Sequence, residues 1–114
     1  MKIVTFGELL MRLSPPKYQK LASARSLDIN YGGAEANSAI SLSQFGHDVS
    51  FVSVLPDNDI GHAALREVRS WGVDTNYCQF KGNKMGSYFM EHRVSIRGGE
   101  IIYDRANSSF SDID

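Results

Sequence analysis

The chain of 114 residues is long enough for about one small domain, and 42% of its residues are hydrophobic against 22% charged. This composition excludes disordered, collagen-like and coiled-coil proteins. Twelve Lys and Arg residues against 13 Asp and Glu give a net charge of -1, which disfavours a nucleic-acid binder. The apolar runs near the N-terminus are too short for a signal peptide or a membrane span. A single cysteine, Cys78, leaves no internal disulfide to form and predicts a reducing, cytoplasmic location.

The first two thirds of the chain alternate between strand and helix patterns. The apolar run 3–6 predicts a buried strand, and 9–14 and 26–31 predict strands with one wetter face. After Gly32 and Gly33, a helix is expected over 34–45, with Gly46 as its stop. A second buried strand is expected over 49–55, then a helix over 60–71 with Asp59 as N-cap and an apolar stripe that includes Trp71. Strands separated by helices favour a parallel α/β architecture.

The last third predicts strands at 77–80, 87–96 and 100–105 and a polar linker over 106–114. If Gly98-Gly99 is a two-residue turn, Val94 pairs with Tyr103 and Arg93 forms an ion pair with Asp104. Side-chain alternation then gathers three residues suited to a polyhydroxylated, acidic ligand on one face of the hairpin: Tyr88, Tyr103 and Arg105. Phe89 and Ile102 fall on the outer face.

The segment Tyr31–Asn37, with the sequence YGGAEAN, is the most informative motif. Its two glycines let the backbone approach a ligand, and the free N–H groups at a helix start attract oxygen atoms. Asn37 offers an amide suited to a sugar hydroxyl. A tight strand-to-helix turn with Asn37 as a capping residue explains the pattern equally well. The acids at 57–61 lack EF-hand spacing and the three histidines are scattered, so no metal site is predicted.

Together these residues resemble the ribokinase (PfkB-type) family of sugar kinases. The resemblance rests on the strand that ends at Gly7-Glu8, on GGAEANSAISLSQFG at 32–46, and on DNDIG at 57–61 before a helix that ends in WGVD. GGAEAN, Gly-Ser-Tyr at 86–88 and Tyr-Asp-Arg at 103–105 are most similar to 2-keto-3-deoxygluconate kinases. The resemblance implies an α/β fold that pairs part of a ribokinase-like, Rossmann-type three-layer core with a small β-sheet lid. The core segments would be 1–8 and 32–80, and the lid segments 9–31 and 81–105.

The resemblance also implies a set of substrate-binding residues: Gly33, Ala34, Glu35, Ala36, Asn37, Tyr88, Tyr103 and Arg105. The run from Gly33 to Asn37 would frame the sugar acid at the helix start. The two tyrosines would supply ring surface and hydroxyls, and Arg105 would face the carboxylate or a nearby oxygen. Asp104 departs from the tyrosine often found in this position, and the expected hairpin register points it away from the sugar.

The family's catalytic base is the Asp of a Gly-x-Gly-Asp motif, which this sequence lacks. The catalytic Asp and most contacts to ATP and Mg²⁺ are therefore expected beyond residue 114, and no catalytic or metal-ligating residue is expected within the chain. The chain would be the N-terminal part of an ATP-dependent sugar-acid kinase and inactive alone. The alternatives are a kinase for fructose or another neutral sugar, and a non-catalytic sugar-binding or dimerisation module. The apolar outer face of the lid favours a homodimer.

Overall fold

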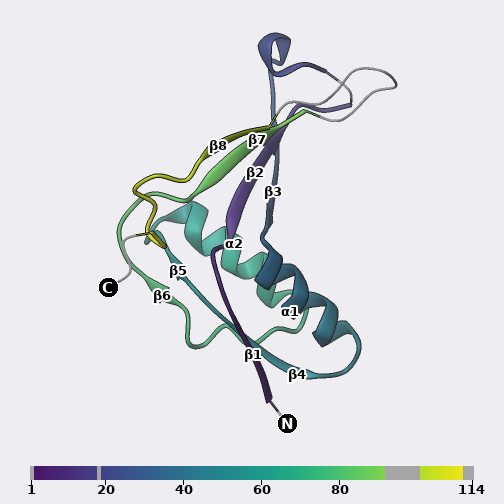
Figure 1. The fold of residues 1–114 in the computed structure, drawn as a ribbon, viewed down its shortest axis with the longest axis vertical. Coiled ribbons are helices and arrows are strands. Elements are labelled where there is room, and N and C mark those ends of the chain that lie inside the picture. Colours follow the sequence, from purple (N-terminus) through teal and green to yellow (C-terminus); the bar gives the residue numbers. More distant parts are fainter. Residues whose placement is uncertain (1, 18, 92–100, 112–114) are drawn as a thin grey trace.

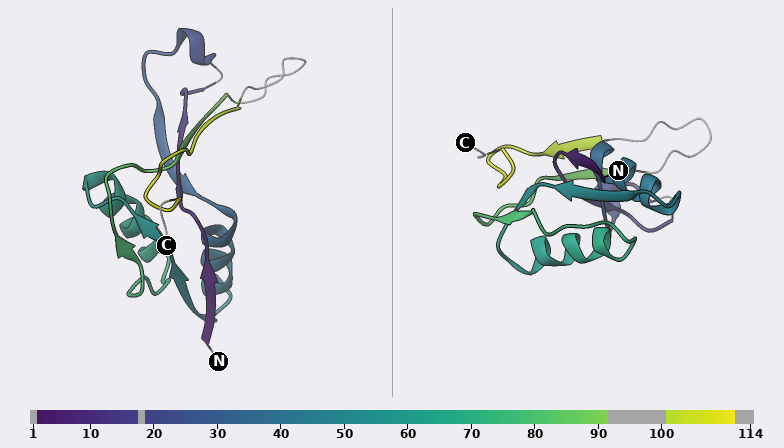
Figure 2. Two further views of the ribbon diagram at one scale, coloured as in Figure 1. Left: turned by 60° about the vertical axis from the view of Figure 1, so that its left-hand side comes forward. Right: turned by 90° about the horizontal axis from the view of Figure 1, so that it is seen from below.

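The computed structural model describes residues 2–17, 19–91 and 101–111. Within these ranges, two parallel strand pairs and two helices form one body, from which a four-stranded sheet extends (Figure 1). Figure 2 shows from the side how far this sheet projects beyond the body. The parallel pairs are β1 (Lys2–Phe6) with β4 (Asp48–Val52), and β5 (Val54–Leu55) with β6 (Gln79–Phe80).

The four-stranded sheet has the order β3-β2-β7-β8. Its strands are β2 (Leu10–Ser14), β3 (Asp28–Gly32), β7 (Ser87–Met90) and β8 (Ile101–Asp104). A short 3-10 helix, η1 (Leu21–Ser23), lies between β2 and β3. Strand β2 runs antiparallel to β3 and parallel to β7, and β7 runs antiparallel to β8. The parallel pairing of β2 with β7 joins two segments that lie far apart in the sequence.

Helix α1 (Ala34–Gln44) starts directly after β3, and helix α2 (Asp59–Arg69) follows β5. Gly46 has a φ of 91°, a conformation that glycine adopts readily, and this ends α1 as predicted. The prediction of Asp59 as the N-cap of α2 is wrong by one position. Asn58 has extended backbone and its side-chain oxygen accepts the Gly61 N–H at 3.0 Å, whereas Asp59 already lies in the first turn.

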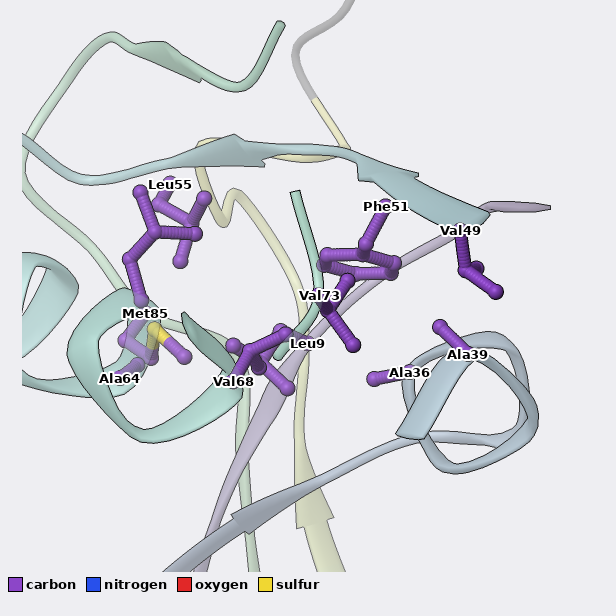
Figure 3. Packing of buried hydrophobic residues seen from close by; sticks show 11 residues of the cluster. Leu9, Ala36, Ala39, Val49, Phe51, Leu55, Ala64, Val68, Val73 and Met85 are labelled. Atoms are coloured by element: carbon purple, nitrogen blue, oxygen red, sulfur yellow. The ribbon is translucent and has the colours of Figure 1, made fainter. Parts of the chain in front are cut away.

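The hydrophobic core lies between β4 and the two helices (Figure 3). Val49 and Phe51 point from β4 toward both helices, where α1 contributes Ala36 and Ala39 and α2 contributes its buried residues Ala64, Leu65 and Val68. All of these side chains are at most 2% exposed. In the described part of the chain the core therefore has a layer of strands and one layer of helices.

The opposite face of the strand layer is largely uncovered within the described ranges. Val4 and Phe6 of β1 lie on it and are 61% and 55% exposed, so the prediction of a buried strand is wrong for this face. The predicted α2 stripe is also wrong at Trp71, which is 46% exposed because α2 ends at Arg69. Neither helix in the described ranges has the length and apolar content to cross a membrane.

Two further expectations need correction. The single strand expected over 49–55 divides at Ser53, because β4 pairs with β1 while β5 pairs with β6. The linker expected over 106–114 is wrong for residues 106–111. Ser108 and Ser109 are buried, and the Ser109 N–H donates to the Lys84 carbonyl at 2.9 Å. Residues 112–114 lie outside the described ranges.

The hairpin register differs from the prediction by six residues. Tyr88, rather than Val94, pairs with Tyr103, and Met90 pairs with Ile101. The two-residue turn expected at Gly98-Gly99 lies outside the described residues. A shift by an even number preserves the faces of a strand, so Tyr88 and Tyr103 still share one. Arg93 lies outside the described residues. Asp104 does lie on the face away from Tyr103, where Lys84 Nζ contacts it at 2.9 Å.

Candidate functional site

One row of side chains crosses the whole four-stranded sheet. The register places Arg12 beside Asn30 on one side and beside Tyr88 on the other, and Tyr88 beside Tyr103. Paired residues of neighbouring strands project from the same face of a sheet. The sheet thus presents an amide, a guanidinium and two phenol rings in one line, with the two rings 5.6 Å apart. This polar row is Asn30–Arg12–Tyr88–Tyr103.

The polar row forms one wall of a pocket of about 450 Å³. The start of α1 forms another, and the pocket lies where the sheet meets the body of the protein. Its lining consists of Leu10, Arg12, Asn30, Tyr31, Gly32, Gly33, Ala34, Asn37, Tyr88, Tyr103 and Arg105. The volume suits a small molecule, and most of the lining groups can donate or accept hydrogen bonds.

Six of the eight predicted substrate-binding residues line this pocket: Gly33, Ala34, Asn37, Tyr88, Tyr103 and Arg105. The other two do not. Ala36 is fully buried, and its side chain packs in the hydrophobic core between α1 and β4. Glu35 lies in the first turn of α1, and its carboxyl group packs against Gly7. The structure therefore brings six of the eight predicted residues together around one pocket, and their binding of a substrate stays a prediction.

Gly33 brings the backbone of β1–β2 close to the helix start. A β-carbon on Gly33 would overlap the carbonyl oxygen of Glu8, so only glycine fits here without movement. Gly33 also accepts the Asn37 N–H at 2.8 Å, the first hydrogen bond of α1. Asn37 is thus a first-turn residue and not the cap, and its exposed side chain faces the pocket. The close approach of Gly33 to the Glu8 carbonyl gives this glycine a packing role within the protein, and the approach of a ligand to the double glycine stays a prediction.

Arg105 is held by a carboxylate from the other end of the chain. Its Nε and Nη2 donate to Oε1 of Glu8 at 3.0 and 2.7 Å, and the Ser108 hydroxyl donates to Oε2 at 3.0 Å. The Glu8 side chain is only 8% exposed. Gly86 passes so close to this carboxylate that a β-carbon there would overlap it. Glu8 therefore fixes the guanidinium at the pocket edge and balances its charge.

The sequence reasoning missed three residues of this site: Arg12, Asn30 and Glu8. The alternation of 9–14 did mark Arg12 as part of a wetter face, but no pattern within one strand shows which strands lie beside it. Asn30 was missed for the same reason, because the pattern of its half-buried strand does not show which strand lies beside it. Glu8 was noticed only as the end of the first strand, and its partner lies 97 positions away.

The lining contains no Asp, Glu, His or Lys within the described residues. Burial, with Glu67 nearby, raises the pKa of the Tyr31 hydroxyl, which is therefore protonated at neutral pH. The described lining residues can bind and orient a polar ligand, but they include no carboxylate or imidazole to remove a proton.

Comparison with known proteins identifies the family of this chain. The model of the pfkB family of carbohydrate kinases matches residues 1–113. The chain belongs to the pfkB carbohydrate kinase family. Its fold is the ribokinase-like α/β fold of that family, as the solved relatives show.

Three similar proteins illustrate the relationship. A 2-dehydro-3-deoxygluconokinase from Thermotoga maritima is 46% identical, with a TM-score of 0.97 over 100% of this chain and 35% of that one. A PfkB family carbohydrate kinase from Listeria grayi is 38% identical, with a TM-score of 0.95 over 99% of this chain and 35% of that one. A 2-dehydro-3-deoxygalactonokinase from Haloferax volcanii is 36% identical over 95% of this chain and 34% of its own length. The chain thus spans about a third of the length of these pfkB relatives.

Proposed function

We propose that this chain forms the sugar-binding part of an ATP-dependent kinase whose substrate is a sugar acid, 2-keto-3-deoxygluconate. The observation that carries the proposal is the pocket at the start of α1, whose lining holds two arginines and no carboxylate within the described residues. A neutral sugar needs hydrogen-bonding groups but no cation, whereas a carboxylate is bound best by a guanidinium. The names of the similar proteins from T. maritima and H. volcanii support the same substrate class.

The chemistry of each lining group indicates its proposed role in binding the sugar acid. Asn37 and Asn30 offer amides to hydroxyl groups, and the two tyrosines of the polar row offer ring surface and hydroxyls. Gly33 and Ala34 bring the N–H groups of the helix start to the pocket wall, where they attract oxygen atoms. In this proposal segments 1–8 and 32–80 are core, and segments 9–31 and 81–105 form a lid over the sugar.

ATP and Mg²⁺ are assigned to a part of the protein outside this chain. The described residues contain no group of three His, Cys, Asp or Glu side chains that could hold a metal ion. The sequence also has no Gly-x-Gly-Asp motif to supply the base that removes the proton from the sugar hydroxyl. We therefore propose that the catalytic Asp lies beyond residue 114 and that residues 1–114 alone transfer no phosphate.

A homodimer through the four-stranded sheet is also proposed. Behind the polar row, the register aligns a second row made only of apolar side chains: Ile29–Leu13–Phe89–Ile102. Ile29 and Ile102 are 56% and 47% exposed, and a groove of about 570 Å³ lies beside Phe89 and Ile102. An exposed apolar row of this kind favours burial against a second copy. Replacing Ile102 with Lys is expected to yield monomers in light scattering, and an unchanged mass would refute the interface.

A cytoplasmic location is proposed on the chemistry of Cys78. The thiol is half-buried and donates to the Phe51 carbonyl at 3.2 Å, and burial raises its pKa. Such a thiol is a packing group and not a disulfide partner, which suits a reducing compartment.

A substrate panel on the full-length protein tests the proposed function. Phosphorylation is measured with ATP and Mg²⁺ for 2-keto-3-deoxygluconate, 2-keto-3-deoxygalactonate, fructose and ribose. The proposal expects the keto-deoxy acids to be used with the highest kcat/KM. Preference for fructose would replace it with the neutral-sugar alternative. Binding of a sugar without any transfer would favour the non-catalytic module. Turnover by purified residues 1–114 would refute the assignment of the base to another part of the protein.

A further inference from the structure

We propose that Arg12 is the residue that distinguishes an acidic from a neutral sugar in this pocket. This inference rests on the proposed function, because it concerns the ligand of the same site. It differs from the sequence expectation, which gave that role to Arg105.

The place of Arg12 in the sheet supports the assignment. Strand β2 is an inner strand of the four-stranded sheet, so Arg12 has a polar-row neighbour on each side, Asn30 and Tyr88. Its side chain is partly buried and lines the pocket. Arg105, by contrast, lies just after β8 at one edge of the sheet, and its side chain is 51% exposed. A cation at the centre of a pocket wall is less screened by water than one at its edge.

The charges around the two arginines also support the assignment to Arg12. Glu8 accepts two hydrogen bonds from Arg105, so this pair is neutral as a unit. Arg12 has no carboxylate within ion-pairing distance among the described residues, and it makes no side-chain hydrogen bond there. Its Nε is shielded from solvent and still lacks an acceptor. Among the described residues the lining therefore carries one uncompensated positive charge, which belongs to Arg12.

An uncompensated, partly buried guanidinium is costly unless a ligand supplies the missing acceptors. A carboxylate matches both needs, because it neutralises the charge and its two oxygens fit the planar fork of an arginine. The hydroxyls of a neutral sugar supply acceptors but no charge. Arg12 thus stabilises the bound acid group specifically, while the amides and phenols of the polar row bind features common to both ligands.

The test compares two ligands that differ only at the acid group, 2-keto-3-deoxygluconate and 3-deoxyfructose, by calorimetric titration of the full-length protein. The variants are Arg12→Gln and Arg12→Lys, with Lys81→Gln as a control that removes one positive charge from an exposed position outside the pocket. Arg12→Gln is expected to weaken the acid about 10- to 100-fold and the neutral sugar by less than about threefold. Arg12→Lys is expected to recover part of the loss, and Lys81→Gln to change neither ligand.

The two ligands and the variants distinguish an error in the substrate class from an error in the role of Arg12. If the wild-type protein binds 3-deoxyfructose as tightly as the acid, the sugar-acid proposal is wrong and the role of Arg12 falls with it. If the wild type prefers the acid and Arg12→Gln keeps that preference, only the role of Arg12 is refuted. An equal loss for both ligands, with the circular dichroism and melting temperature of the wild type retained, would make Arg12 a general part of the wall. Should Arg12→Gln fail to fold, the ratio of the two affinities in Arg12→Lys decides instead, since a preference equal to the wild type's there refutes the bidentate contact.

Discussion

Glu8 and Arg105 form an ion pair that ties the end of β1 to the end of β8, with Arg105 Nη2 2.7 Å from Oε1 of Glu8. The two residues are 97 positions apart, and Ser108 completes the cluster through Oε2 of Glu8. Their contact connects the four-stranded sheet to the body on the side where β8 has no neighbouring strand within the described ranges. It sets the position of one pocket wall relative to the other.

Glu8 and Arg105 are expected to be coupled in stability. In a double-mutant cycle with Glu8→Gln and Arg105→Gln in the full-length protein, the coupling in the free energy of unfolding should be about 1 kcal/mol. The buried carboxylate strengthens the pair and the exposure of Arg105 screens it. Urea unfolding measures the cycle. Glu67→Gln replaces Glu8→Gln in the control cycle, because Glu67 is exposed on α2 and should show no coupling. Equal coupling in both cycles would contradict the assignment.

Gly33→Ala tests the close approach at the start of α1. The added β-carbon would overlap the Glu8 carbonyl oxygen, so either the helix start or the end of β1 must move. A cost of about 1–3 kcal/mol in the free energy of unfolding is expected, with a raised KM for the sugar. Ser38→Ala, an exposed position on the same helix, is the control and should leave both values unchanged. A Gly33→Ala protein with wild-type KM and stability would show that the approach is not required.

The N-cap of α2 distinguishes two neighbouring residues. Asn58→Ala removes the hydrogen bond to the Gly61 N–H and the one that its Nδ2 donates to the Asn83 carbonyl at 2.9 Å. It should lower the free energy of unfolding by about 1 kcal/mol, measured from the urea midpoint. Asp59→Ala loses only a charge near the helix N-terminus and should cost less, about 0.5 kcal/mol. The reverse order would restore Asp59 as the cap.

Asp74 should make the protein more stable near neutral pH than in acid. Hydrogen bonds from the Asn76 N–H, from Lys2 and from Ser50 lower the pKa of its carboxyl group. A carboxylate whose pKa is lower in the folded than in the unfolded state stabilises the protein above its unfolded pKa. That stabilisation disappears as pH falls from about 4 through the folded pKa. The melting temperature of wild type should therefore exceed that of Asp74→Asn at pH 7, and the difference should shrink toward pH 3. A constant difference would contradict this linkage.

Local patterns predicted most of the elements and most of the pocket. Period-2 and period-3.6 alternation located β2, β3 and both helices to within two residues, because the residues that set these patterns are neighbours in sequence. The double glycine and the tyrosines of the hairpin were found for the same reason. What sequence periodicity could not supply was the pairing of strands. Arg12 joins the site only because β2 lies between β3 and β7, and β7 lies 76 residues further along the chain.

The wrong predictions were drawn from local sequence patterns, which do not show strand register, helix ends or contacts between distant residues. The predicted hairpin register depends on Gly98-Gly99 as a turn, whereas the observed register places Tyr88 opposite Tyr103 and Phe89 opposite Ile102. The two registers differ by an even number of residues and keep the same faces, so side-chain alternation could not distinguish them. Likewise Trp71 fits a helical stripe by spacing, but α2 ends before it. Ser108 looked like a linker residue because its partner, Glu8, is distant in sequence.

We propose that the pocket between the polar row and α1 binds a sugar acid through its carboxylate. A crystal structure of the full-length protein with 2-keto-3-deoxygluconate tests it most directly. A carboxylate oxygen is expected about 2.7–3.0 Å from the Arg12 guanidinium, with sugar hydroxyls against Asn37 and the tyrosines of the polar row. A sugar acid bound in another cavity, or one whose carboxylate faces away from the polar row, would contradict it.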